Sequence, residues 1–426
     1  MSSYKDKMPT KVDKAKLSDR EKFLLNDSKY FCTLPWTHLH AYPNGAAYPC
    51  CLAKHEYPIG SMKENTIEEL WNSPDMKDIR KNMLSEQPSK QCTKCYEQEE
   101  HGWTSMRNSG NIHFGHHVDK IKETTADGHY DDVNMIYWDI RFSNLCNLSC
   151  RSCGSIFSSN WYDDQVALWG KPDHTKVTYA GTTKMDAYDQ LVQYLPVVEQ
   201  VYFAGGEPLI MEEHYKILKE LIRLGKADTV RLIYNTNFTR QAYKDLNVFD
   251  YWPEFKDVSV GASLDAMGPR AELMRNGTKW SDVEHNRETM LKKCPDVDFY
   301  ISPTVGIFNY SHVIDFHNDW MEKGFIKEGD LNLNMIQDPL HYRIDVITPK
   351  MKREVEPKYK EHIEKIRPKD YLGRATGGFE SALNMMMAED RTDLLPTFKR
   401  ITAQLDKHRG QETHEIFPEL SEILID

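Results

Sequence analysis

The sequence predicts an α/β protein whose core is a partial, TIM-like (βα)6 barrel. Six short runs rich in apolar, β-branched and aromatic residues recur between residues 134 and 336, and amphipathic segments such as MEEHYKILKELIRLG (211–225) separate them. Strands that alternate with helices form parallel βαβ units. Six strands are too few to close an eight-stranded barrel. We therefore expect a curved, partly open sheet with functional residues at the carboxyl ends of its strands.

The chain divides around this core by composition. The six expected strands lie in NMIYWDIRF (134–142), VEQVYFAGG (198–206), TVRLIYNTN (229–237), DVSVGASLD (257–265), VDFYISPTV (297–305) and LNLNMI (331–336). The flanking parts are a polar leader (1–29), a small cysteine-rich α+β domain (30–110), a polar linker (111–133) and a helical region (337–426). Within the cysteine-rich part, the segment 67–83 is expected to be a helix capped by Asn65 or Thr66.

Charge and hydropathy exclude two classes of function. The 426 residues carry a formal net charge of −11 and show no basic stripe, so general nucleic-acid binding is not expected. No segment approaches the ~18 consecutive apolar residues of a membrane span, and the polar N-terminus lacks the apolar core of a signal peptide. We expect a cytoplasmic protein, in which nine cysteines indicate metal or catalytic use more than disulfides.

Three of these cysteines follow the first expected strand within eight residues. The stretch RFSNLCNLSCRSCGS (141–155) holds Cys146, Cys150 and Cys153 in a C-x3-C-x2-C spacing. Iron–sulfur clusters take cysteine thiolates, and a four-iron cluster usually takes four, so three ligands leave one iron open to another chelator. A three-cysteine zinc site completed by a histidine is the alternative, but no histidine lies nearby.

A second motif ends the second expected strand. AGGEP (204–208) pairs two glycines, which let a backbone approach a ligand closely, with Glu207, whose carboxylate suits an ammonium group. It lies some fifty residues beyond the cysteines. On these two motifs together, residues 134–336 resemble the radical S-adenosylmethionine (SAM) superfamily.

The resemblance implies a cofactor site in the barrel mouth. Cys146, Cys150 and Cys153 would bind a [4Fe–4S] cluster, and the amino and carboxylate groups of SAM would chelate its open iron. Glu207 and the backbone of the two adjacent glycines, Gly205 and Gly206, would hold the SAM amino group. The residue before the third cysteine is usually aromatic in this family and packs near adenine. Here it is Ser152, which puts that contact in doubt.

Three later strand ends fit the same pattern less specifically. Asn235 belongs to NTN at the third strand end, and Ser263, in SLD, is similar to the family's ribose- and carboxylate-binding position. Arg275, in MRNG, resembles the arginine that pairs with the SAM carboxylate. For each of the three, a turn or surface residue without a ligand is the alternative.

Four cysteines before the barrel predict a second, closed site. Cys32 and Cys50 flank Gly45, a hairpin pivot, and CTKC supplies Cys92 and Cys95. Four thiolates suit either structural zinc or a fully ligated [4Fe–4S] cluster. The pattern resembles the twitch domain, a shortened SPASM domain with an auxiliary [4Fe–4S] cluster, which favours iron. Such domains usually follow the barrel, whereas this one precedes it. The neighbouring Cys51 is expected to be a spare, buried thiol.

Two other groups of residues have plainer interpretations. Cys294 is expected to be a buried apolar side chain near the end of a helix. Four irregularly spaced histidines in residues 111–132 could bind metal, but a solvated linker is the preferred interpretation.

The resemblance implies a radical SAM oxidoreductase-type enzyme that uses SAM and two [4Fe–4S] clusters. It would cleave SAM reductively to a 5'-deoxyadenosyl radical and abstract hydrogen from a peptide or small molecule, with net oxidation or crosslinking. An external electron donor of flavodoxin or ferredoxin type is expected. A radical SAM methyltransferase and a non-catalytic iron–sulfur or metal-binding protein are the alternatives, and the sequence identifies no catalytic residue on the substrate side.

Overall fold

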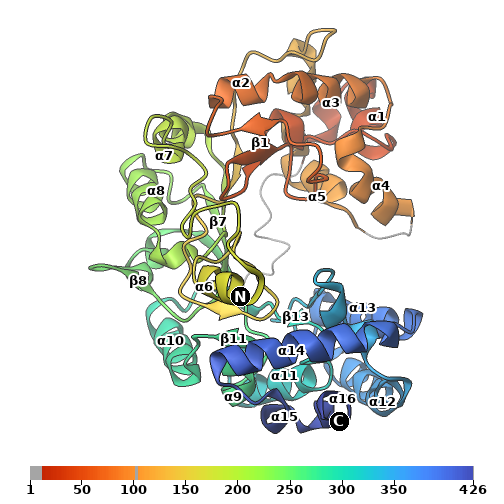
Figure 1. Ribbon diagram of the computed structural model, residues 1–426. Helices are drawn as coiled ribbons and strands as arrows, with labels where there is room; N and C mark the ends of the chain where they lie inside the picture. Colours follow the sequence, from red (N-terminus) through yellow and green to blue (C-terminus); the bar gives the residue numbers. More distant parts are fainter. Residues whose placement is uncertain (1–11, 101–103, 426) are drawn as a thin grey trace.

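The computed structural model describes residues 12–100 and 104–425 (Figure 1). The first eleven residues of the predicted leader lie outside this description. One eight-stranded sheet runs through the molecule in the order β12-β10-β7-β6-β4-β1-β2-β3. The cysteine-rich domain lies at one end of this sheet and the C-terminal helices lie toward the other end (Figure 1).

The parallel part of the sheet confirms the predicted fold class. Neighbouring strands β4, β6, β7, β10 and β12 pair in parallel. Their bounds are Tyr137–Ile140, Gln200–Phe203, Arg231–Thr236, Asp257–Ala262 and Asp298–Ile301. The sixth predicted strand is shorter than expected: β14 (Asn334–Met335) pairs in parallel with β13 (Thr304–Val305) in a separate two-stranded sheet. The sixth segment continues the main sheet only through an isolated parallel bridge between Leu331 and Ile301 of β12, so the barrel is partly open.

Helices follow the strands because their apolar residues recur on one face. In α8 (Glu212–Arg223), the side chains of Tyr215, Ile217, Leu218 and Leu221 are buried, and the intervening glutamates and lysines face outward. The other core helices have the bounds α6 (Trp161–Trp169), α7 (Ala187–Leu191), α9 (Gly268–Met274), α10 (Trp280–Lys293) and α11 (His312–Glu322).

The cysteine-rich domain shares the barrel's sheet. Strand β1 (His38–Ala41) pairs in parallel with β4, and β2 (Ala46–Tyr48) and β3 (Gly60–Ser61) extend the sheet antiparallel beyond it. Gly45 turns the chain between β1 and β2 at φ +92°, a conformation that favours glycine. This pairing fixes the domain directly against the first barrel strand, although the two are separated by a long stretch of chain.

The helix expected over 67–83 is interrupted. It forms α2 (Ile67–Trp71) and α3 (Pro74–Leu84), because Pro74 starts a new helix after the Ser73 cap. Of the two candidate caps, Thr66 caps α2 and forms a reciprocal capping box with Glu69.

Much of the predicted leader and linker is helical. Part of the leader forms α1 (Asp19–Asn26). The chain after the CTKC motif forms α4 (Thr93–Glu100) and α5 (Met106–Phe114), and a 3-10 helix, η5 (Gly115–Glu123), continues into the predicted linker. Phe114 and Val118 are buried there, so residues 111–123 pack against the domain instead of remaining solvated.

The C-terminal region is helical, as expected. It comprises α12 (Pro349–Ile366), α13 (Arg374–Ala388), α14 (Leu395–Arg409), α15 (Thr413–Ile416) and α16 (Ser421–Leu424). Helix α14 packs against α6, the helix that follows the three-cysteine loop (Figure 1). Across residues 12–100 and 104–425, none of the helices has the length and apolar character that crossing a bilayer requires.

Candidate functional site

A cavity of about 260 Å³ opens at the carboxyl ends of β4, β6, β7 and β10. It brings together most of the site residues predicted from sequence. The predicted residues that line it are Cys146, Cys150, Cys153, Gly205, Gly206, Asn235, Ser263 and Arg275. Glu207 does not line it. The topology explains the convergence, because parallel strands end at one edge of the sheet.

The three thiols form a donor set that fits a soft metal centre. Burial, followed by the proximity of Cys150, raises the pKa of the Cys153 thiol to about 12, and burial also raises the pKa values of Cys146 and Cys150. Without a metal these thiols would stay protonated, whereas a metal replaces the protons and stabilises the thiolates.

Hydrogen-bond donors point at two of the sulfurs. Cys146 Sγ accepts from the backbone N–H of Leu148 at 3.5 Å and from Asn237 Nδ2 at 3.9 Å. Cys150 Sγ accepts from Arg275 Nη1 at 3.9 Å. Donors of this kind tune the reduction potential of iron–sulfur clusters, so the surroundings of the thiols fit the predicted cluster.

Backbone pairing holds the cysteine loop against the segment that carries Arg275. Strand β5 (Ser149–Cys150) pairs antiparallel with β11 (Arg275–Asn276), with Cys150 opposite Arg275. Arg275 is fixed in turn by a bidentate ion pair with Asp265, at 2.8 and 3.0 Å. Its Nε and Nη2 atoms are used in this pair, so Nη1 is the part of the guanidinium directed at the thiols.

The two glycines of AGGEP lie directly against the cysteine loop. A Cβ on Gly206 would come within 2.1 Å of the Leu145 carbonyl oxygen, and Gly205 has φ +117°. The backbone N–H of Gly206 donates to Ser143 at 3.1 Å and that of Glu207 to Leu145 at 2.7 Å. No side chain fits between these loops, which accounts for the paired glycines.

Glu207 is fully buried behind the cavity wall. Its carboxylate accepts from Thr236 Oγ1 and from the backbone N–H of Asn237, both at 2.7 Å, and from the N–H of Leu209 at 3.1 Å. Burial outweighs these donors and raises the pKa of Glu207 to about 7. The carboxylate therefore joins the end of β7 to the glycine loop, and its predicted contact with the SAM amino group stays a prediction.

Local hydrogen bonds hold the side chain of Asn235 and the backbone of Ser263. Asn235 Nδ2 donates to the Tyr202 hydroxyl at 2.6 Å, and the Ser263 backbone N–H donates to Thr236 at 2.7 Å. Sequence reasoning missed Asn237, which also donates to Asn147 Oδ1 at 2.9 Å and so ties β7 to the cysteine loop. Its place in NTN, at the end of a predicted strand, was the available signal.

Contacts between the C-terminal helices and the cysteine loop were not predicted from the sequence. Arg151, between the second and third cysteines, forms an ion pair with Asp406 on α14 and donates to Gln411 Oε1 at 2.7 Å. Asp164 on α6 pairs with Arg409 at 2.6 Å and with His408 at 3.2 Å. The C-terminal region thus contributes to the site by positioning the loop.

An ionic cluster at the end of β4 was also missed. Arg141 lines the cavity, and its Nε donates to Asp139 Oδ1 at 2.8 Å, while His40 Nδ1 lies 3.0 Å from Asp139 Oδ2. Burial opposes the charge on Asp139, but Arg141 and His40 outweigh it and keep the pKa of the carboxyl well below its usual range. Arg141 therefore brings a guanidinium paired with the Asp139 carboxylate to the cavity, and its position near the end of a predicted strand was the signal for it.

An aromatic side chain is present in the cavity despite Ser152. Ser152 lines the wall, and so does Phe157, which is 40% exposed and packs against Tyr42 at 5.7 Å between ring centroids. Phe157 lies four residues after Cys153, outside the position that the family pattern uses.

The four cysteines of the second predicted site are gathered by the N-terminal domain. Burial, and after it the nearby thiols of Cys51, Cys92, Cys95 and Cys32, raise the pKa of Cys50 well above its usual value. In contrast, after burial, the charged groups that act most on Cys51 are Asp139 and Arg141, and its pKa rises to about 12. Cys51, predicted to be a spare, buried thiol, is half-buried in the structure.

Arg107 connects two of the cysteine-bearing segments. It pairs with Glu99 on α4, the helix of Cys95, and donates to the Phe31 carbonyl at 2.9 Å, next to Cys32.

Among the described residues, no three cysteine sulfurs lie within 4.8 Å of one another. Tetrahedral zinc with Zn–S bonds of about 2.3 Å would hold its sulfurs about 3.8 Å apart. In this structure the thiols are thus not drawn together as closely as around a zinc ion.

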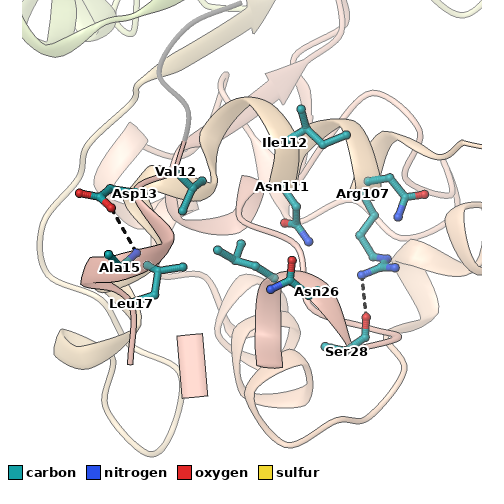
Figure 2. Close-up of a pocket in the computed structure, with 11 residues that line it drawn as sticks. Val12, Asp13, Ala15, Leu17, Asn26, Ser28, Arg107, Asn111 and Ile112 are labelled. Atoms are coloured by element: carbon teal, nitrogen blue, oxygen red, sulfur yellow. Dashed lines mark hydrogen bonds between the residues drawn. The ribbon is translucent and has the colours of Figure 1, made fainter. Parts of the chain in front are cut away.

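Arg107 also borders a larger cavity of about 710 Å³ in the N-terminal domain (Figure 2). Its wall mixes apolar side chains such as Leu17 and Ile112 with Asn26 and Asn111. Arg107 Nη1 donates to the Ser28 carbonyl at 3.0 Å there. No cysteine lines this cavity, so its volume does not contribute to either cysteine site.

One known family matches part of the cysteine-rich domain. Residues 32–96 match the SPASM family, an iron–sulfur cluster-binding domain. The match includes all four cysteines predicted for the auxiliary site. It confirms that this part of the chain resembles a SPASM domain and supports iron–sulfur as its cofactor. Comparison with curated proteins gave no match.

Comparison with solved structures returned partial likenesses. Native anSMEcpe with bound AdoMet and Cp18Cys peptide is 21% identical, with 54% of this chain and 60% of that chain covered and a TM-score of 0.38. SuiB of Streptococcus suis bound to S-adenosylmethionine is 12% identical, with 69% and 62% covered and a TM-score of 0.38. TYW1 with a lysine-pyruvate adduct is 12% identical, with 55% and 72% covered and a TM-score of 0.29. The chain spans about three fifths of the length of the first structures it matches.

Proposed function

We propose that this protein is a radical SAM enzyme that abstracts hydrogen from a peptide or small-molecule substrate in a net oxidation or crosslinking reaction. The observation that carries the proposal is the convergence of three buried thiols, a paired-glycine backbone and Arg275 on one cavity at the strand ends. When bound, a reduced [4Fe–4S] cluster with SAM at its open iron supplies a 5'-deoxyadenosyl radical that removes a hydrogen atom from substrate.

The protein's own residues would position the reactants. Cys146, Cys150 and Cys153 would hold the cluster, and the side chain of Arg275, already fixed by Asp265, would direct its remaining nitrogen toward the SAM carboxylate. The backbone of Gly205 and Gly206, which lines the cavity beside the cysteine loop, would lie along the methionine part of SAM. Rigid positioning of this kind limits the radical to one target and keeps water out.

We assign the adenine contact to Phe157 in place of the usual aromatic residue at position 152. Phe157 lines the same cavity as the thiols and has an exposed ring surface. An aromatic face stacks on a nucleobase with a favourable energy of ~1–3 kcal/mol. Asn235 and Ser263, from the neighbouring strand ends, would bind the ribose and carboxylate part of SAM.

Substrate would enter past the N-terminal domain, where Arg141 offers a positive charge to a carboxylate or peptide carbonyl. Cys32, Cys50, Cys92 and Cys95 would hold an auxiliary [4Fe–4S] cluster, with no ligand position left for substrate. Such a closed cluster is suited to electron transfer. The first electron would come from an external donor of flavodoxin or ferredoxin type.

The test is anaerobic reconstitution followed by incubation with SAM and dithionite. We expect about eight irons per chain and formation of 5'-deoxyadenosine and methionine. A Cys150→Ala variant should retain about four irons and lose SAM cleavage, whereas Cys294→Ala, a buried thiol near neither cysteine set, should retain both. S-adenosylhomocysteine as the product would favour a methyltransferase, and iron binding without SAM cleavage would overturn the enzyme proposal.

A further inference from the structure

Two adjacent histidines of the predicted linker meet a single glutamate from the barrel. His116 Nε2 lies 3.0 Å from Glu199 Oε2, and His117 Nε2 lies 2.8 Å from Glu199 Oε1. The two imidazole rings are 4.0 Å apart between centroids. All three side chains are partly exposed, at 18–30% of their full surface, so an ion from solvent can reach them.

In an ordinary ion pair two side chains meet, whereas here three potential metal ligands lie close together. One potential ligand atom from each of the three residues lies within 4.8 Å of the other two, and each histidine contacts a different oxygen of Glu199. Two imidazoles and one glutamate form a common ligand set for zinc, which keeps a fourth position for water. In a tetrahedral site with bonds of about 2.0–2.1 Å, neighbouring ligand atoms lie about 3.3 Å apart. The two N···O separations, 3.0 and 2.8 Å, are a few tenths of an ångström shorter than this, and because they involve different oxygens of Glu199, binding of one zinc ion would also reorient that carboxylate.

The backbone around the three residues holds the ligands in place. Glu199 precedes β6, its N–H donates to the Ile136 carbonyl at 2.8 Å, and its carbonyl accepts from the Arg231 N–H at 2.8 Å. The histidines lie on η5, which packs against α1 and α5 of the N-terminal domain. The glutamate is therefore fixed by the sheet, while the histidines are fixed by the domain.

We propose that His116, His117 and Glu199 bind a zinc ion that clamps the N-terminal domain to the barrel. The site lies at the amino end of β6, whereas the three-cysteine cavity lies at the carboxyl ends of the strands. The ion would thus be separate from both cysteine sites. Three protein ligands leave the fourth zinc position to water, but because they come from η5 and from the start of β6, the ion would strengthen the junction at which β1 pairs with β4 and so keep the two cysteine sites in register. The proposal is independent of the SAM chemistry.

The experiment uses full-length protein with its iron–sulfur sites reconstituted, treated with chelator, desalted and then titrated with Zn²⁺ alone. We expect one added zinc per chain and a higher melting temperature. X-ray absorption at the zinc edge should show nitrogen and oxygen ligands near 2.0–2.1 Å with an imidazole signature. Sulfur scattering near 2.3 Å would instead place the zinc on cysteines and overturn the proposal.

Three matched variants complete the test. Glu199→Gln and His117→Ala should each weaken zinc binding by at least about tenfold, because removing a direct ligand costs no less than removing an outer-shell partner. His129→Ala changes an exposed histidine of the same segment, paired with Asp131, and should bind zinc as the parent does. Zinc uptake that is equal in all variants, or absent from the parent, would refute the site. SAM cleavage is measured in the same samples, so loss of the radical chemistry and loss of the zinc site are distinguished.

Discussion

Replacing Gly206 by alanine tests the close approach on which the cavity depends. The added Cβ would meet the Leu145 carbonyl oxygen at 2.1 Å and the carbonyl carbons of Asn144 and Leu145 at 2.6 Å. Ordinary contacts begin at 3.4 Å, so the loop that carries Cys146 must retreat by more than 1 Å. Backbone cannot rotate out of the way as a side chain can, and the hydrogen bond from Glu207 N–H to Leu145 at 2.7 Å opposes the movement.

We expect the Gly206→Ala variant to fold with a loss of about 1–3 kcal/mol in stability. A displacement of about 1 Å at reacting groups can lower a rate ~100-fold, so SAM cleavage should fall by at least that factor. Gly154→Ala is the matched control in the same loop. Gly154 follows Cys153 directly, and a Cβ there would meet no atom within 4 Å.

The assay counts iron and 5'-deoxyadenosine in parallel after anaerobic reconstitution. Gly206→Ala should keep the four irons of the N-terminal site, which shows that the chain is folded, and lose or weaken the second cluster. Gly154→Ala should match the parent in both measurements. If Gly206→Ala cleaved SAM at the parental rate, the close packing of the glycine loop against the cysteine loop would have no functional role.

Three further changes test individual contacts. Phe157→Ala should raise the dissociation constant for SAM about tenfold with Phe157→Tyr near parental, and equal constants in isothermal titration would remove Phe157 from the adenine site. Because burial raises the pKa of Glu207 to about 7, folded protein holds a proton that unfolded protein releases above pH ~4.5. The free energy of unfolding, measured in urea, should therefore fall by about 3 kcal/mol as pH rises from about 4.5 to 7. Glu207→Gln should make the free energy of unfolding less dependent on pH in this range, and the same pH dependence in both proteins would contradict the raised pKa of Glu207. Asp406→Asn leaves the buried Arg151 guanidinium without its carboxylate, so we expect a loss of about 3 kcal/mol and faster iron release, with parental iron retention as the contrary result.

The sequence predicted the barrel and the centre of its site because both depend on local signals. Apolar runs alternating with amphipathic segments identified the parallel strands, and strand ends are where a parallel sheet gathers its polar residues. C-x3-C-x2-C and AGGEP each follow a strand, so their meeting in one cavity required only the sheet topology. The burial of Cys294 is confirmed for the same reason, since it ends an amphipathic helix.

What the sequence did not predict depends on contacts between distant segments. Asp406 lies more than 250 positions from Arg151, and nothing in either local pattern marks the pair. Strand β1 of the cysteine-rich domain pairs with β4 of the barrel. The change in composition near residue 133, which marks where the barrel begins in the sequence, does not indicate that the two parts share a sheet. The histidines of the linker are irregular in sequence, and only Glu199, from the start of β6, makes His116 and His117 a set.

The most direct test of the central claim is SAM turnover by the reconstituted protein. Reduced with dithionite and given SAM, the parent should release 5'-deoxyadenosine and methionine in equal amounts, and Cys146→Ala should release neither above the background of buffer alone. Equal product from the parent and Cys146→Ala, or no product from a parent that carries both clusters, would contradict the assignment of this cavity to radical SAM chemistry.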